Sequence, residues 1–174
     1  MRWNDLFADL EGQLGAAADA QFSSDVADRT RGERASVALE ARFAGAVGAT
    51  VSVTLRDGEK FSGTLTDVAS TWILVSETAR QSWIPLAALV ALGGLGPRSV
   101  ELPAVARKLS VGHALRALSR DRSEVVVCTT GGRWSGIIAQ VGADYVEIRE
   151  RDTRALTVLP FGVMTRVFSA GVAH

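Results

Sequence analysis

Cysteine is almost absent from this chain, whose 174 residues include only Cys128. A single cysteine cannot form an intramolecular disulfide, and it also excludes a Cys-x-x-Cys metal or redox site. Cys128 follows three valines in a stretch of strand character, which predicts a buried structural thiol rather than a reactive one. We therefore expect the chain to fold in a reducing compartment.

Histidine is nearly as scarce, with His113 and His174 as the only two. Acid–base or nucleophilic catalysis ordinarily needs a positioned base, and the pattern around His113 predicts an exposed helix position. Asp57 is explained by the tight turn that it forms with Gly58, and Asp67 and Asp144 belong to different repeats without a histidine beside them, so the three carboxylates do not predict a metal site. We interpret the chain as a non-enzymatic protein with no catalytic residue, metal, cofactor or small-molecule substrate.

The sequence also lacks a long hydrophobic run and a net charge. Nineteen basic and nineteen acidic residues cancel, so no field of the whole molecule attracts nucleic acid or anionic lipid. No stretch approaches the roughly 18 uninterrupted apolar residues of a membrane span, and the first residues lack a signal-peptide core. These absences predict a cytoplasmic protein without membrane contact. Basic residues are nearly all arginine, as in proteins from GC-rich bacterial genomes.

Residues 1–46 have the apolar periodicity of helices. In the first of them, the apolar side chains recur at steps of three and four and share one stripe: Trp3, Leu6, Phe7, Leu10 and Leu14. Such a stripe is either part of a core or a docking face for another subunit. We take it as a candidate partner-binding surface.

From Val51 the apolar period changes to two, which is typical of strands. Asp57-Gly58 predicts a tight hairpin turn, and Gly63 inside the next strand predicts a bend or bulge. Further short apolar runs bring the total to five strands in about forty residues.

The same pattern returns downstream, which is the most informative feature of the sequence. At one fixed offset Gly58 matches Gly131, Phe61 matches Trp134, and Gly63 matches Gly136. After a two-residue insertion, Ile84-Pro85-Leu86 matches Leu159-Pro160-Phe161. The matching aromatic positions argue for a shared architecture, whereas Trp83 has no aromatic counterpart.

The stretch VSVTLRDGEKFSGTLTDVASTWILV resembles the first sequence motif of the Sm-like family of SH3-like small β-barrels, and VVVCTTGGRWSGIIAQVGADYVEI resembles a degenerate copy of it. The resemblance implies an α+β chain in which two tandem five-stranded SH3-like barrels, each preceded by a helix, follow an N-terminal helical segment. The predicted parts are N-terminal helices at 1–46, a first barrel at 47–95, a linker at 96–107, and a helix with a degenerate second barrel at 108–170.

The departures from the family bear on function. Sm-like RNA binders have an Asp and an Asn in the loop after the bent strand, and an Arg-Gly pair near the last strands. Asp67 and Asp144 stand near that loop without an Asn, and Pro85-Leu86 and Pro160-Phe161 replace the second motif. The resemblance therefore does not imply an intact uridine pocket.

Two functions remain open. The first is protein interaction or self-assembly, because short barrels leave strand edges that can pair with a neighbour; a homo-oligomer is the simplest form, and a protein partner is the other. The second is binding of RNA or DNA through a basic patch near the second predicted helix. Its candidate residues are Arg107, Lys108, Arg116, Arg120, Arg122 and, for base stacking, Trp134.

Overall fold

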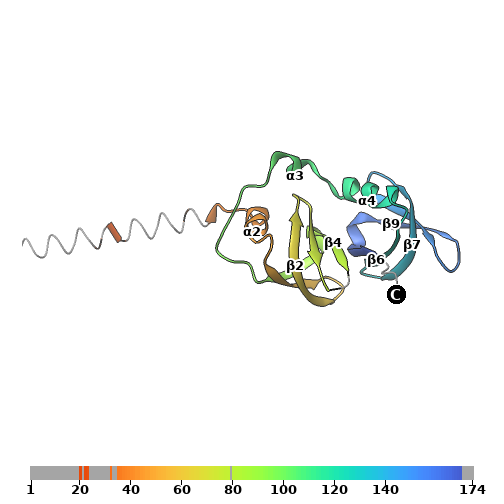
Figure 1. Ribbon diagram of the computed structural model, residues 1–174, viewed down its shortest axis with the longest axis horizontal. Helices are drawn as coiled ribbons and strands as arrows, with labels where there is room; N and C mark the ends of the chain where they lie inside the picture. Colours follow the sequence, from red (N-terminus) through yellow and green to blue (C-terminus); the bar gives the residue numbers. More distant parts are fainter. Residues whose placement is uncertain (1–19, 21, 24–31, 33–34, 79, 170–174) are drawn as a thin grey trace, which may run out of the picture. The chain divides into compact units, whose positions relative to one another are not determined.

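The computed structural model describes residues 20, 22–23, 32, 35–78 and 80–169 (Figure 1). The chain divides into two compact units, Met1–Ala38 and Leu39–His174. In the first unit, the amide of Ser36 donates a hydrogen bond to the carbonyl oxygen of Gly32, at 3.2 Å. The second unit begins with helix α2 (Leu39–Gly45), which buries Phe43.

The first repeat forms five antiparallel strands in the order expected from the sequence. They are β1 (Thr50–Leu55), β2 (Lys60–Val68), β3 (Trp72–Ser76), β4 (Gln81–Pro85) and, after the 3-10 turn η1 (Leu86–Ala88), β5 (Leu89–Gly93). The predicted alternation in β1 is confirmed, since Val51, Val53 and Leu55 are buried. The Asp57-Gly58 turn is also present, with φ of +85° at Gly58.

The second repeat follows two short helices, α3 (Ala104–Lys108) and α4 (Val111–Arg120). Its strands are β6 (Glu124–Thr129), β7 (Gly132–Val141), β8 (Tyr145–Glu150), β9 (Leu156–Pro160) and, after the 3-10 turn η2 (Phe161–Val163), β10 (Met164–Ser169). The bulge between Leu65 and Asp67 recurs between Ile138 and Gln140. The repeat seen in the sequence therefore extends to the pairing register.

The two matched glycines, Gly63 and Gly136, stand where neighbouring strands come unusually close. A Cβ atom on Gly63 would lie 2.5 Å from the carbonyl oxygen of Ser76. A Cβ on Gly136 would likewise collide with the backbone of Arg149. Glycine is required at both positions because any side chain would force the strands apart.

The expected pair of barrels is wrong. The ten strands form one open antiparallel sheet in the order β5-β1-β2-β3-β4-β10-β6-β7-β8-β9, with three short helices in the part of the chain that the structure describes. The fold therefore does not consist of two five-stranded barrels, each preceded by a helix. Strand β10 pairs with β6 of its own repeat and, on its other side, with β4 of the first repeat, so the sheet continues from one repeat into the other.

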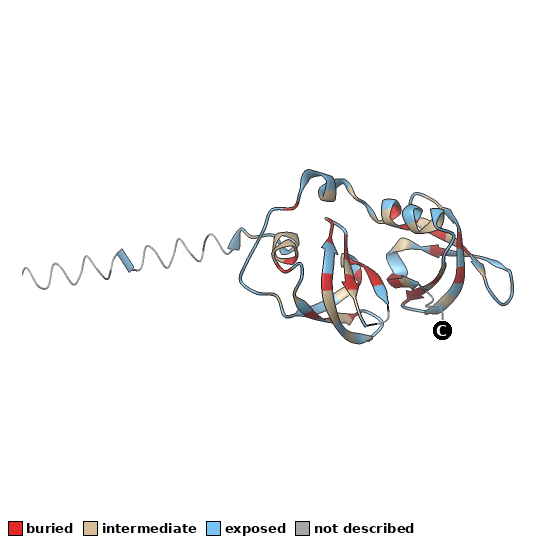
Figure 2. Ribbon diagram, in the orientation of Figure 1, coloured by how far each residue is buried: buried red, intermediate tan, exposed pale blue. Residues whose placement is uncertain are grey.

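Two apolar clusters lie against this sheet (Figure 2). The first is built around Phe43, Val53, Leu65 and Ile84 from the first repeat and α2. The second contains Leu115 of α4 and the apolar residues of β6 to β10, together with Ala69, Trp72 and Trp83 of the first repeat. First-repeat side chains thus complete the core of the second repeat. Within the described residues, no helix is long and apolar enough to cross a membrane.

Candidate functional site

The residues considered for catalysis have structural surroundings. The ring nitrogen Nδ1 of His113 lies 2.8 Å from the hydroxyl of Ser110, at the start of α4. Cys128 is fully buried, and burial raises the pKa of its thiol, so it stays protonated at neutral pH. Among the described residues, no group of three His, Cys, Asp or Glu side chains is placed to hold a metal ion. The N-terminal stripe from Trp3 to Leu14 lies outside the described residues.

The basic residues predicted to bind nucleic acid have different surroundings in the structure. Arg107 donates a hydrogen bond to the carbonyl oxygen of Leu102, at 3.0 Å, and pairs with Glu101. Arg116 reaches the carbonyl oxygen of Gly142, at 3.3 Å. Lys108 is exposed at the end of α3. Trp134 is half-buried against the second apolar cluster and is therefore only partly free to stack on a base.

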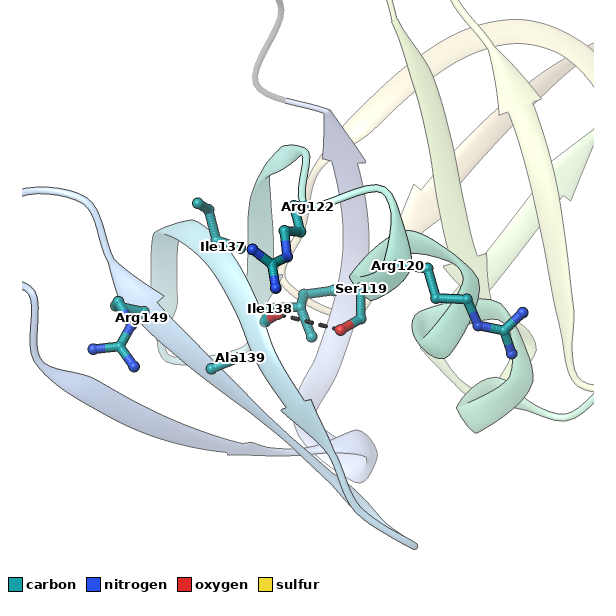
Figure 3. Close-up of a pocket in the computed structure, with 7 residues that line it drawn as sticks. All are labelled: Ser119, Arg120, Arg122, Ile137, Ile138, Ala139 and Arg149. Atoms are coloured by element: carbon teal, nitrogen blue, oxygen red, sulfur yellow. Dashed lines mark hydrogen bonds between the residues drawn. The ribbon is translucent and has the colours of Figure 1, made fainter.

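The two remaining predicted arginines, Arg120 and Arg122, line an open hollow of about 670 Å³ together with Arg149 (Figure 3). The hollow lies between the end of α4 and strands β7 and β8, and Ser119 ties these elements together through a 3.3 Å hydrogen bond to the carbonyl oxygen of Ile138. Figure 3 shows Arg120 pointing away from the other two arginines. Arg149 was missed because it is distant in sequence and no spacing signals it.

The two repeats are joined in one sheet where β4 pairs with β10, and we call this pairing the junction. Val167 pairs with Trp83 and Phe168 pairs with Ser82 along the strands. Trp83 is 4% exposed and stacks at a tilt against Trp72, with 6.4 Å between ring centroids. No sequence pattern indicates a role for these residues, although Trp83 has no aromatic counterpart in the second repeat.

Arg166 of β10 is the polar centre of this junction and is 1% exposed. Its Nε donates a hydrogen bond to the hydroxyl of Ser82, at 2.9 Å, and its Nη1 lies 2.8 Å from a carboxylate oxygen of Glu59. Its Nη2 binds the carboxylate of Glu77. The guanidinium also lies 4.1 Å from the ring centroid of Phe61. Four first-repeat side chains thus enclose one second-repeat arginine.

Two further hydrogen bonds cross the junction. The hydroxyl of Thr165 donates to the carboxylate of Asp57, at 2.6 Å, and Arg56 donates to the carbonyl oxygen of Gly162, at 2.8 Å. At the rim, Arg133 lies 3.5 Å from the second carboxylate oxygen of Glu59. Buried polar groups need partners, and this network gives Arg166 a partner for each of its donor nitrogens.

Among the strands that the structure describes, the outermost two, β5 and β9, each have one side without a paired strand. On β9, Leu156 and Val158 are each 54% exposed, and on β5, Val90 is 64% exposed. Beside β5, an apolar groove of about 170 Å³ is lined by Leu39, Phe43 and residues of η1 and β5. Exposed apolar side chains on an unpaired strand are the features that favour pairing with another chain.

Next to β9, the carboxylate of Glu150 accepts hydrogen bonds from the hydroxyls of Thr157 and Thr153, the latter at 3.0 Å. The bond from Thr157, followed by that from Thr153, lowers the pKa of Glu150. The carboxylate is therefore ionised at neutral pH and places a fixed negative charge at the open edge.

Comparison with known proteins found no matching protein-family model and no similar curated protein. The resemblance to the Sm-like motif consequently remains a prediction from the residues.

Proposed function

We propose that this chain is a non-enzymatic protein-interaction module that binds an extended segment of a partner protein along strand β9. One observation carries the proposal: β4 is the counterpart of β9 in the repeat, and β4 already binds such a strand, namely β10. The edge of β9 offers the same backbone groups without an occupant from the described part of the chain. Strand addition of this kind gives affinity through main-chain hydrogen bonds.

The side chains of β9 support the same proposal. Val158 is the counterpart of Trp83. Both side chains are apolar, but only Trp83 is buried. Proteins usually protect an unpaired strand with lysine or proline, and β9 has neither before its terminal Pro160. An apolar edge that lacks this protection is suited to binding a strand.

A peptide with the sequence of residues 162–169 is expected to bind the full-length chain at β9. We expect hydrogen exchange to slow at those amides of residues 156–159 that point away from β8, because they become hydrogen-bonded to the peptide; Pro160 has no amide hydrogen. Val158→Lys should weaken binding about tenfold or more, because it places a charge where the peptide needs an apolar contact.

Val90→Lys is the matched control, because it adds the same charge to an exposed valine at the opposite edge, on β5. Protection that stays at β9 in Val90→Lys and disappears in Val158→Lys supports the proposal. Unchanged exchange of β9 at saturating peptide would contradict it. If the partner is instead a second copy of this chain, light scattering would show a molar mass that rises with protein concentration, and either substitution would lower that mass.

Nucleic-acid binding is the second candidate, favoured by the hollow between α4 and β8. Arg122 and Arg149 line it with no acidic residue among its lining residues. If RNA binds there, Arg122→Glu with Arg149→Glu should weaken the gel shift with single-stranded RNA and flatten the salt dependence of the remaining binding. A shift that is the same in the double variant would exclude the hollow as the RNA site.

A further inference from the structure

Resting on the proposed function, we infer that the partner strand carries an arginine, which binds Glu150 and Thr157 beside β9. The inference comes from the site that holds Arg166. That site is built by the first repeat, and most of its chemical groups recur in the second repeat, at the open edge.

The counterparts are fixed by the pairing registers. Val75 pairs with Ser82 in the first repeat, as Ile148 pairs with Thr157 in the second. Glu77 follows Val75 by two residues, and Glu150 follows Ile148 by two residues. The backbone amide of each glutamate donates a hydrogen bond across its own hairpin, from Glu77 to the carbonyl oxygen of Arg80 and from Glu150 to that of Ala155. Glu150 and Thr157 therefore occupy the positions of Glu77 and Ser82.

The chemistry of these pairs is also the same. Ser82 donates its hydroxyl to Glu77, at 3.0 Å, and Thr157 donates its hydroxyl to Glu150. In the first repeat, Arg166 adds to this pair by donating Nε to the hydroxyl oxygen and Nη2 to the carboxylate. In the second repeat, no described cation is paired with Glu150. The carboxylate and hydroxyl that receive a guanidinium are thus present without one.

The aromatic part of the site recurs as well. Phe61, which lies beneath the guanidinium of Arg166, pairs with Val53, and Trp134 pairs with Val127 at the corresponding place. The exception is Glu59, whose counterpart by sequence offset is Gly132. A Cβ atom on Gly132 would lie 3.5 Å from the ring of Trp134, so the larger ring extends toward the space next to this glycine. The second site therefore offers one carboxylate, one hydroxyl and one ring.

A second copy of this chain does not supply the required arginine. The free strand β5 is the counterpart of β10, and Ala91 pairs with Thr54 where Arg166 pairs with Cys128. Alanine thus stands at the position that would face Glu150. The charge complement of the edge points to a strand from another protein. Arginine is favoured over lysine because the planar guanidinium presents separate nitrogens to the hydroxyl and the carboxylate in a fixed geometry, as Arg166 does, whereas an ammonium group is a single point charge.

The test uses the full-length chain and the residue 162–169 peptide in three forms, with Arg, Lys or Ala at the position of Arg166. We expect the Arg peptide to bind about tenfold or more tightly than the Ala peptide, since charge-assisted hydrogen bonds are lost in the latter. The Lys peptide should be intermediate. Glu150→Gln should remove the preference for Arg, and Thr157→Val should reduce it.

Glu147→Gln is the control, because Glu147 lies on the same strand as Glu150 and its counterpart, Leu74, is apolar and offers no acceptor to Arg166. It should leave the preference unchanged. Equal binding of the Arg and Ala peptides, with protection at β9, would overturn the arginine inference while leaving the proposed function intact. Absence of protection at β9 with every peptide would overturn both.

Discussion

Replacing Arg166 with alanine should lower the free energy of unfolding by about 3–5 kcal/mol, the usual cost of removing one member of a buried ion pair. Arg166 is almost fully buried, and its removal would take from the carboxylates of Glu59 and Glu77 their buried cation, leaving each with only a more exposed arginine. It would also remove a partner from Ser82. Urea unfolding followed by circular dichroism measures the difference.

Arg133→Ala provides the matched control for this loss. Arg133 also pairs with Glu59, but its side chain is exposed, so we expect a change of about 1 kcal/mol or less. If the two substitutions cost the same, the burial of Arg166 would not be what makes it important. A cost below about 1 kcal/mol for Arg166→Ala would contradict the role of the junction network.

Local features of the fold could be predicted from the sequence because they depend on neighbours along the chain. The alternation of Val51, Val53 and Leu55 predicts strand β1, and Asp57-Gly58 predicts the turn after it; both are present. The match between Gly63 and Gly136 indicates the repeat, because at both positions the neighbouring strand leaves no room for a side chain. The helix predicted before the second repeat is present as α4, with Leu115 buried.

The pairing of β4 with β10 could not be predicted in the same way. The backbone edge of a strand is the same whichever strand occupies it, so periodicity does not say whether a repeat closes on itself or joins another. Arg166 could not be recognised for a related reason: an arginine in a strand is normally exposed, and its acceptors are 84 to 107 residues away along the chain. Trp83, an aromatic residue without an aromatic counterpart, was the one visible signal.

The two repeats differ at the strand edge that forms the junction in one repeat and is open in the other. At the covered edge stand Trp83 and Ser82, facing a strand with Arg166; at the open edge stand Val158 and Thr157, with no described strand beyond them. The carboxylate and hydroxyl pair is kept at both edges, whereas the large aromatic is found only where it is covered. This pattern is what a reversible binding edge needs, because a permanently exposed tryptophan would promote aggregation.

Trp83→Ala should be about as damaging as the loss of Arg166, lowering the free energy of unfolding by about 3–5 kcal/mol. Trp83 lies in the second apolar cluster although it belongs to the first repeat, so its removal leaves a cavity between the repeats. The indole N–H has no described hydrogen-bond acceptor, so the loss is one of packing alone. Trp83→Phe should therefore retain most of the stability, and urea unfolding would show it.

Val158→Ala makes the corresponding change at the counterpart position on the open edge. Val158 is more than half exposed, so the free energy of unfolding should change by only about 0.5 kcal/mol. The two substitutions together separate a strand edge that stabilises the fold from one that is available for binding. Equal losses of stability at both positions would mean that β9 is as tightly integrated into the folded chain as β4, and the proposed binding edge would then have no free side to offer a partner.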